Sequence, residues 1–235
     1  MGRTAGTTCD EPPAAARLTW RRSGRTVRPV QNSTCPRCGS AVRPPGLMSS
    51  DWSCERHGPV SPLRTWTRVG PDVLAQAAAH VDVPLWCPLP LLPGWSVTGL
   101  AVAGDERAAG RATALALSGP SPLGGPADLV LVAEEPGTGL GGRLAGTVAL
   151  DPGGIADSAP DAKLLAAGHP TALWMVDSAE DRVAFAGEAG GVWLWAVLWP
   201  PAAELILLEH VELHDLRHER HTGLDLPVGV PTARL

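Results

Sequence analysis

Short apolar segments, separated by glycine, proline and aspartate, dominate the chain from residue 95 to residue 199. They are rich in Val, Leu, Ala and Trp and fit either a period of two or a continuous apolar run, which is typical of buried strands. Gly190-Gly191 separates two of these segments and suits the tight turn of a β-hairpin. The strands predicted from this pattern cover residues 95–103, 111–118, 128–133, 172–176, 182–188 and 192–199.

The last of these segments contains Trp193, Trp195 and Trp199, which point the same way at a period of two. Its other positions are also apolar, and a strand that is apolar on both faces normally lies at the centre of a sheet. We therefore expect these tryptophans in the core. The alternative is an aromatic platform on which a base or another ligand stacks.

Helical spacing occurs in fewer places. Residues 71–83 begin with a proline and carry an apolar stripe, which predicts a helix. Residues 139–145 and 161–167 are predicted as short helices, and residues 205–216, which fit both periods, are assigned to strands. Because most strands follow one another without long helices between them, the pattern predicts an α+β fold with a mainly antiparallel sheet and a few short helices.

Breaks in this pattern divide the chain into five parts. Residues 1–32 show no periodicity and are predicted to form a disordered tail. Residues 33–62 form a cysteine-containing module, and residues 63–94 form a helix and a proline-rich connector. Residues 95–217 form the α+β body, and residues 218–235 are expected to be a flexible C-terminus.

The composition is that of a globular protein, with 44% apolar and 18% charged residues. The net charge of −5 is unevenly divided, since residues 1–70 hold eleven arginines against four acidic residues, whereas the remainder holds eight basic and twenty acidic residues. An arginine-rich start on an acidic body suits contact with nucleic acid or with an acidic protein surface. The alternatives are that the two parts attract each other or that the arginines lie on a solvated tail.

The sequence also bears on the compartment. The first thirty residues lack the apolar core of a signal peptide. The most apolar stretch, residues 192–208, is interrupted by Pro200-Pro201 and by Glu204, so it is too short and too broken to span a bilayer. Cysteines spaced as metal ligands suit a reducing compartment. We therefore expect a cytoplasmic protein that does not enter a membrane.

The cysteine module carries the pattern C-x2-C-x15-C-x2-H, formed by Cys35, Cys38, Cys54 and His57. A two-residue spacing lets both side chains of a tight turn reach one ion, and thiolate and imidazole are ligands that zinc prefers. A glycine follows each pair and permits the backbone conformation in which turn N–H groups donate to the sulfurs. The pattern predicts two facing zinc knuckles, the plan of a zinc ribbon.

The predicted zinc site is structural. Four protein ligands leave no open position for water, so the ion is not expected to catalyse a reaction. Three thiolates with one Zn²⁺ give a formal charge of about −1, which Arg37, Arg43 and Arg56 are placed to offset. Zinc ribbons contact nucleic acid, protein or only their own chain, and the sequence leaves these three possibilities open.

Two glycine-rich segments, 118–126 and 135–143, offer backbone amides to an anion. Neither matches a Walker loop or a complete dinucleotide fingerprint, and the alternative is that both are plain turns at strand ends. Adjacent carboxylates are candidates for general acid or base work, but charged groups at strand ends are usually solvated. The candidate ligand-binding residues are Gly124, Gly125, Gly139, Gly141 and Arg143, and the candidate carboxylates are Glu134, Glu135 and Glu188.

Two further groups are weighed against plainer alternatives. Cys87 lies between a tryptophan and a proline and is expected to be a packed, unreactive thiol, because a thiol nucleophile needs a basic partner. His210, His214 and His218 would share one face of a helix and could hold a second metal ion. The alternative for the histidines is a polar chain end.

The chain contains several distinctive segments, among them Cys-Pro-Arg-Cys-Gly at 35–39, Trp-Ser-Cys-Glu-Arg-His-Gly at 52–58 and Phe-Ala-Gly-Glu-Ala-Gly-Gly-Val-Trp-Leu-Trp-Ala at 185–196. In these segments the chain resembles a family of uncharacterised proteins from high-GC Gram-positive bacteria, over residues 33–217. The resemblance implies one shared unit and supplies no catalytic residues. Some members carry a phosphotransacetylase label, but such an enzyme alternates strands and helices, which this pattern does not.

Two functions follow from these observations. The preferred one is a non-enzymatic binding or regulatory module with a structural zinc ion and a negatively charged partner. The alternative is a small transferase-type enzyme that seats a phosphate- or acyl-carrying ligand where the two glycine-rich segments converge. A third possibility is that the zinc module only staples the N-terminus of a body with an unrelated role.

Overall fold

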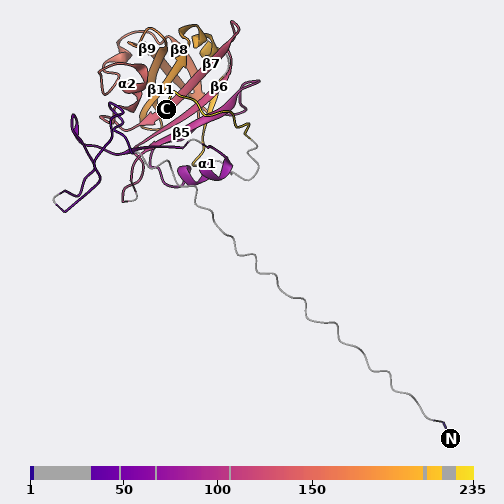
Figure 1. The fold of residues 1–235 in the computed structure, drawn as a ribbon. Helices are drawn as coiled ribbons and strands as arrows, with labels where there is room; N and C mark the ends of the chain where they lie inside the picture. Colours follow the sequence, from indigo (N-terminus) through magenta and orange to yellow (C-terminus); the bar gives the residue numbers. More distant parts are fainter. Residues whose placement is uncertain (3–32, 48, 67, 106, 209–210, 219–225) are drawn as a thin grey trace.

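A ten-stranded sheet forms the centre of the computed structural model, which describes residues 1–2, 33–47, 49–66, 68–105, 107–208, 211–218 and 226–235 (Figure 1). The predicted disordered tail lies almost entirely outside these residues. Across the sheet the strands follow the order β3-β5-β6-β7-β11-β10-β9-β8-β12-β4. Their bounds are β3 Leu63–Trp66, β4 Trp86–Pro88, β5 Ser96–Ala103, β6 Ala112–Pro120, β7 Pro126–Glu134, β8 Ala162–Ala166, β9 His169–Val176, β10 Val183–Ala189, β11 Val192–Trp199 and β12 Glu212–Asp215.

Tight turns build most of the sheet from strands that are neighbours in the chain. β5, β6 and β7 form an antiparallel meander, and β10 and β11 form a hairpin whose register ends at Ala189 opposite Val192. Gly190 and Gly191 make that turn with φ values of +65° and +79°, the left-handed conformation that a two-residue hairpin requires. The predicted hairpin is therefore confirmed. β11 then pairs with β7, which joins the two groups of strands.

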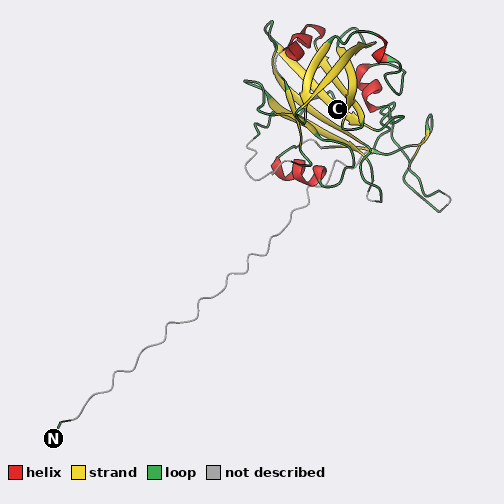
Figure 2. Ribbon diagram, turned by 180° about the vertical axis from the view of Figure 1, so that it is seen from behind, coloured by secondary structure: helices red, strands yellow, loops and turns green. Residues whose placement is uncertain are grey.

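The described part of the chain is mostly β-sheet with a few short helices, as the sequence pattern predicts. Every pairing among the named strands is antiparallel except that of β12 with β8. Figure 2 shows the short helices at the periphery of the strands. They are α1 Pro71–Ala78, α2 Leu140–Ala145 and the 3-10 turns η1 Ile155–Asp157 and η2 Pro201–Leu208. No helix of the described residues is long and apolar enough to cross a membrane.

Three predicted elements differ from the structure. The helix predicted over residues 71–83 ends at Ala78, and Val81 beyond it forms a β-bridge with Gly110. Residues 161–167, predicted as a helix, contain strand β8, in which buried Ala162, Leu164 and Ala166 alternate with exposed side chains. Residues with helical propensity adopt a strand here because β9 pairs along the whole segment. Residues 205–216, assigned to strands, divide into the end of η2 and strand β12.

The sheet curls until β4, at one edge, packs across β6 and β7. The enclosed core takes side chains from α1, η2 and one face of most strands. A second core lies on the opposite face of the sheet, beneath α2, and includes Trp195 and Trp199, with Trp193 partly buried against it. Leu194 and Leu198, the alternate positions of β11, lie in the first core. β11 is thus central and buried on both faces, and the tryptophans are core residues.

Segments predicted to lie outside the body also pack on the sheet. β3 and β4 come from the predicted connector and form the two sheet edges. The body was predicted to end at residue 217, but the Pro227 carbonyl beyond it accepts from the Val97 amide at 2.8 Å. Arg182 and Arg234 lie over the Trp199 ring, each 4.9 Å from its centroid. Residues 226–235 therefore cover part of the sheet and do not form a free end.

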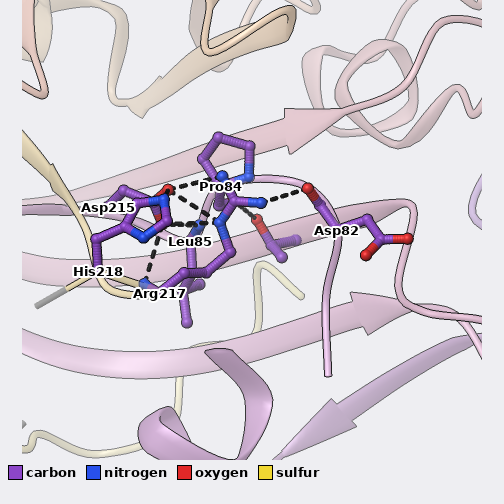
Figure 3. A network of polar contacts seen from close by, with 7 residues as sticks. Asp82, Pro84, Leu85, Asp215, Arg217 and His218 are labelled. Atoms are coloured by element: carbon purple, nitrogen blue, oxygen red, sulfur yellow. Dashed lines mark hydrogen bonds and ion pairs between the residues drawn. The ribbon is translucent and has the colours of Figure 1, made fainter. Parts of the chain in front are cut away.

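A buried carboxylate holds β12 and the segment before β4 together (Figure 3). Asp215 accepts from the Leu85 amide at 3.2 Å and from the Arg217 guanidinium at 2.7 Å. Arg217 also donates to the Asp82 carbonyl, and His218 lies 3.6 Å from the same carboxylate. Burial opposes the charged form of Asp215, but the hydrogen bonds from Arg217 and Leu85 outweigh it and hold the pKa below its usual value.

Candidate metal centre

Each pair of predicted metal ligands lies on a tight turn. In the first turn the Cys35 amide donates to the Ser40 carbonyl and the Gly39 amide donates to the Cys35 carbonyl, both at 2.8 Å. The second turn connects β1, Ser53–Cys54, to β2, Gly58–Pro59. Gly39 and Gly58 have φ values of +74° and +66°, which other residues rarely adopt. The two glycines therefore let the backbone reverse its direction directly after each ligand pair.

Backbone hydrogen bonds join the two turns to each other and to the sheet. Arg43 and Ser53 exchange amide–carbonyl bonds of 2.9 and 3.1 Å, which place the turns side by side. Thr34 and Leu63 exchange a similar pair of 3.0 and 2.7 Å, which attaches the first turn to edge strand β3. We call residues 33–62 with this arrangement the ribbon module. It extends the main sheet through backbone pairing, so its geometry is coupled to the body.

The four ligand atoms converge on one point. The Cys35 and Cys54 sulfurs lie 3.5 and 3.6 Å from His57 Nδ1, and the Cys38 and Cys54 sulfurs lie 3.7 Å apart. All four atoms lie within 4.8 Å of one another. A tetrahedron with metal–sulfur distances of about 2.3 Å and metal–nitrogen distances of about 2.0 Å has edges of about 3.5–3.8 Å. The cluster therefore has the shape and the donors to bind a metal ion with four protein ligands.

The surroundings of the sulfurs also suit a metal ion. Burial raises the pKa of the Cys35 thiol to about 11, even though the backbone N–H groups of Arg37 and Cys38 donate to its sulfur. The pKa of Cys38 is lowered to about 6, mainly by the side chain of Ser40. A cation beside a buried thiol favours its thiolate form. A bound metal ion would supply that charge.

The arginines of the ribbon module have different neighbours. Arg37 donates from Nη2 to the Gly137 carbonyl at 2.7 Å, and Arg56 is exposed. Arg43 pairs with Glu55 at 2.5 Å, and both side chains are largely exposed. The most buried guanidinium at the cluster comes instead from Arg143 of α2, where burial lowers the pKa and the nearby Cys35 and Cys38 groups oppose that shift. Arg143 is thus a counter-charge of the sulfur cluster that the spacing of the cysteines did not reveal.

The two glycine-rich segments lie at opposite ends of β7. Gly124 and Gly125 form the exposed tip of the β6–β7 hairpin, where a Cβ added at either position would meet no atom within 4 Å. Segment 135–143 follows the other end of β7, nine residues away, a separation of about 30 Å along a strand. The segments therefore do not converge on a common pocket, which the transferase alternative requires.

The remaining predicted ligand positions divide into two kinds. Gly141 lies under the Trp195 ring, since a Cβ built there would lie 2.3 Å from the indole nitrogen. The absence of a side chain at Gly141 therefore lets the indole pack against the backbone. Gly139 and Arg143 face the ribbon module. A Cβ at Gly139 would lie 3.1 Å from Arg37 Cγ, and one at Gly39 would lie 3.2 Å from Arg143 Nη1. These two positions are therefore brought next to the metal ligands.

Glu134 is a buried carboxyl, and the expectation that it is solvated is wrong. Its side chain is fully enclosed and accepts from the amides of Leu140 at 2.7 Å and Gly141 at 3.1 Å, at the start of α2. Desolvation raises its pKa to about 7 despite these two donors. Glu135 pairs with Arg111, and Glu188 is exposed. The signal for burial would have been an acidic strand end followed six residues later by a glycine-containing helix.

The other candidate groups give no second site in the described part of the chain. Cys87 is fully buried in β4, and burial raises its pKa to about 12, which matches the expected unreactive thiol. His210 lies outside the described residues. His214 lies on β12 beside Glu212, and His218 lies beside Asp215. Among the described residues, the Cys35–His57 cluster is the group of side chains that could hold a metal ion.

Comparison with known proteins adds a family but no function. No curated protein and no solved structure shows a significant match to the chain. A family described as "Family of unknown function (DUF6758)" matches residues 30–235. The match includes the histidine-rich end, which the resemblance seen in the sequence does not cover. Because it extends over most of the chain, the protein belongs to this family of unknown function, DUF6758.

Proposed function

We propose that the protein is a non-enzymatic zinc-binding protein, in which one structural zinc ion shapes the ribbon module as a binding or regulatory element. The observation that carries this proposal is the convergence of three sulfurs and one imidazole nitrogen within 4.8 Å. Soft sulfur donors with one nitrogen in a tetrahedron favour zinc over magnesium, calcium or manganese. A reducing, cytoplasmic setting keeps such thiolates available to the metal.

A structural role follows from the closed set of ligands. Four protein ligands leave no position for a substrate or an activated water molecule. The ribbon module consists of two short turns and a two-stranded hairpin, which bury little apolar surface of their own. Metal binding therefore provides much of the free energy that folds it. Loss of zinc should release the module and leave the ten-stranded sheet folded.

A negatively charged partner suits the exposed side of the module. Arg56 is exposed on the second turn, and Arg37 lies half-buried on the first. The acidic body repels polyanions, so the positive potential is confined to the module end of the molecule. We expect retention on a heparin column that weakens with salt and falls in Arg56→Gln. Equal retention of this variant and the wild type would contradict a charged interface on the module.

Metal analysis of the purified full chain tests the proposal directly. We expect about one zinc ion per chain, and little or none in Cys54→Ser, which removes one of the four ligands. Cys87→Ser is the matched control, because it makes the same change at a buried thiol outside the cluster. Zinc content that is near zero in the wild type, or unchanged in Cys54→Ser, would contradict the proposal.

A further inference from the structure

A pocket of about 200 Å³ lies where the ribbon module meets α2 and the loop that follows it. Arg37 and Cys38 line it from the first turn, and Arg56 and His57 line it from the second. Arg143 lines it from α2, and residues 147–150 close the remaining side. No aspartate or glutamate is among the described residues that line it. Three arginines therefore line one small concave space.

Glycines on both sides hold two of these arginines in place. The Arg37 alkyl chain crosses Gly139 of the body, where a Cβ would lie 3.1 Å from Cγ. Its guanidinium donates to the Gly137 and Thr138 carbonyls at 2.7 and 3.4 Å. On the other side, Nη1 of Arg143 reaches Gly39 of the module, where a Cβ would lie 3.2 Å from it. The side chains interlock across the interface, so their charged ends are pre-organised and not free to swing into solvent.

The hydrogen-bonding capacity of Arg143 is left unused. Its Nε and Nη2 atoms are buried and donate to no acceptor among the described residues. A buried donor without an acceptor costs about 1–3 kcal/mol, and more when the group is charged. The sulfurs of Cys35 and Cys38 offset the charge of Arg143 but do not accept from it. Both atoms are closed to solvent, so Arg143 acts on the pocket through its charge and not through these two donors.

The charge of the pocket calls for an anion. Three arginines contribute +3, and a zinc ion with three thiolates contributes about −1, which leaves about +2 with the metal bound. Guanidinium groups bind phosphoryl oxygens through charge-assisted hydrogen bonds. A volume of about 200 Å³ is below the range of about 300–1,000 Å³ that is typical for drug-sized ligands. The space suits a small oxyanion or the charged head of a larger ligand.

We propose that this pocket, formed by Arg37, Arg56 and Arg143 beside the metal cluster, binds a phosphoryl group. The three arginines come from three separate elements and line the pocket from different sides. A tetrahedral phosphoryl group presents at least three acceptor oxygens in three directions, whereas a carboxylate presents two in one plane. Arg143, whose Nε and Nη2 atoms are closed to solvent, would stabilise the bound phosphoryl group through its positive charge.

The inference deepens the proposed function and rests on it, because the zinc ion holds Arg37 and Arg56 next to their ligand cysteines and histidine. It also limits the kind of partner, since a phosphate-bearing molecule is a subset of the negatively charged partners expected above. Chelation of zinc should therefore weaken phosphate binding along with the module. Phosphate should in turn slow the loss of zinc, because a ligand that binds only the folded module stabilises it.

Isothermal titration calorimetry on the zinc-loaded full chain tests the inference, with inorganic phosphate titrated against a chloride background of equal ionic strength. Glycerol phosphate, a simple phosphomonoester, serves as the second probe. The variants are Arg143→Gln and Arg56→Gln, and Arg43→Gln is the matched control on the same module but outside the pocket. Removing one positive charge from the pocket should raise the Kd at least about tenfold in the first two and leave the control unchanged.

The outcomes separate the two proposals. Saturable binding of inorganic phosphate supports a site for the free ion, and much tighter binding of the monoester supports a site for the head of a larger ligand. No saturable binding of either probe at about one zinc per chain would overturn the phosphoryl site and leave the proposed function standing. An increase in Kd in Arg43→Gln as large as in the two pocket variants would also overturn the phosphoryl site. A chain without zinc that binds phosphate through Arg143 would overturn the proposed function alone.

Zinc content is measured in every variant, and Arg56→Gln keeps the test decisive if Arg143→Gln fails to fold, since Arg56 is exposed. If Arg143 were only a counter-charge of the cluster, Arg143→Gln would lose zinc and neither probe would bind the wild type. That result would overturn the phosphoryl site.

Discussion

Replacing Glu134 with glutamine should remove a pH dependence from the stability of the protein. Glu134 is fully enclosed at the end of β7 and accepts from two amides at the start of α2. Burial disfavours its charged form and raises the pKa to about 7 from an ordinary value of 4.5, and the charge of Asp151 adds to this effect. Glutamine keeps the size of the side chain and a carbonyl acceptor but carries no titrating proton.

The sign and the size of the effect follow from these two pKa values. Between pH 4.5 and about 7 the folded protein keeps a proton on Glu134 that the unfolded chain has released. The free energy of unfolding therefore falls as the pH rises through this range, and it is constant with respect to this group above it. Raising the pKa from 4.5 to about 7, at about 1.4 kcal/mol for each tenfold change in proton affinity, amounts to a loss of about 3–4 kcal/mol.

Urea denaturation followed by tryptophan fluorescence at about pH 5 and about pH 8 measures this difference. Other groups also titrate, so the informative quantity is the change between the two pH values in the wild type minus the same change in Glu134→Gln. Glu135→Gln is the matched control, because the carboxylate of Glu135 neighbours Glu134 in the chain but is partly exposed and paired with Arg111. If Glu134→Gln keeps the full dependence of the wild type, the buried carboxyl does not hold a raised pKa in the folded protein.

Two further predictions concern the cysteines and the glycine beneath the central tryptophan. The fifth cysteine, Cys9, lies outside the described residues and is replaced with serine for this test. In the Cys9→Ser protein loaded with metal, a thiol reagent should find no fast-reacting cysteine, then three after chelation, and the fourth, buried Cys87, only after unfolding. Reaction of Cys87 together with the other three would contradict its packing. Gly141→Ala should lower the free energy of unfolding by about 1–3 kcal/mol or more in urea denaturation, because the new Cβ would lie 2.3 Å from Trp195 Nε1. Gly46→Ala, which meets no atom within 4 Å, should have little effect, and equal losses in both variants would refute the steric explanation.

Features that depend on residues close together in the chain were predictable from the sequence. The two residues between Cys35 and Cys38, and between Cys54 and His57, are enough to place each pair on one turn. Gly190-Gly191 predicts its hairpin because few other residues tolerate two consecutive left-handed conformations. The continuous apolar pattern of residues 192–199 predicts a central strand because both of its faces must be buried.

Features that depend on distant segments were not predictable in this way. Residues 161–167 have helical propensity, yet pairing with β9 outweighs it, since a propensity difference of a few tenths of a kcal/mol per residue is smaller than the gain from a packed sheet. Glu134 reads as a solvated strand end, and only the return of α2 over the sheet encloses it. The separation of the two glycine-rich segments likewise follows from their places at the two ends of β7.

By itself the sequence determined the four candidate metal ligands, most of the strands and the mostly β character of the fold, because these depend on local spacing and on the burial of alternate side chains. The tertiary structure decided that Arg143, eighty-six residues after His57, lies beside the metal cluster, and that Gly39 and Gly139 admit the arginines that cross them. No local sequence pattern predicts this contact between Arg143 and the ribbon module, because backbone pairing of the ribbon module with β3 and packing of α2 on the sheet bring the two surfaces together.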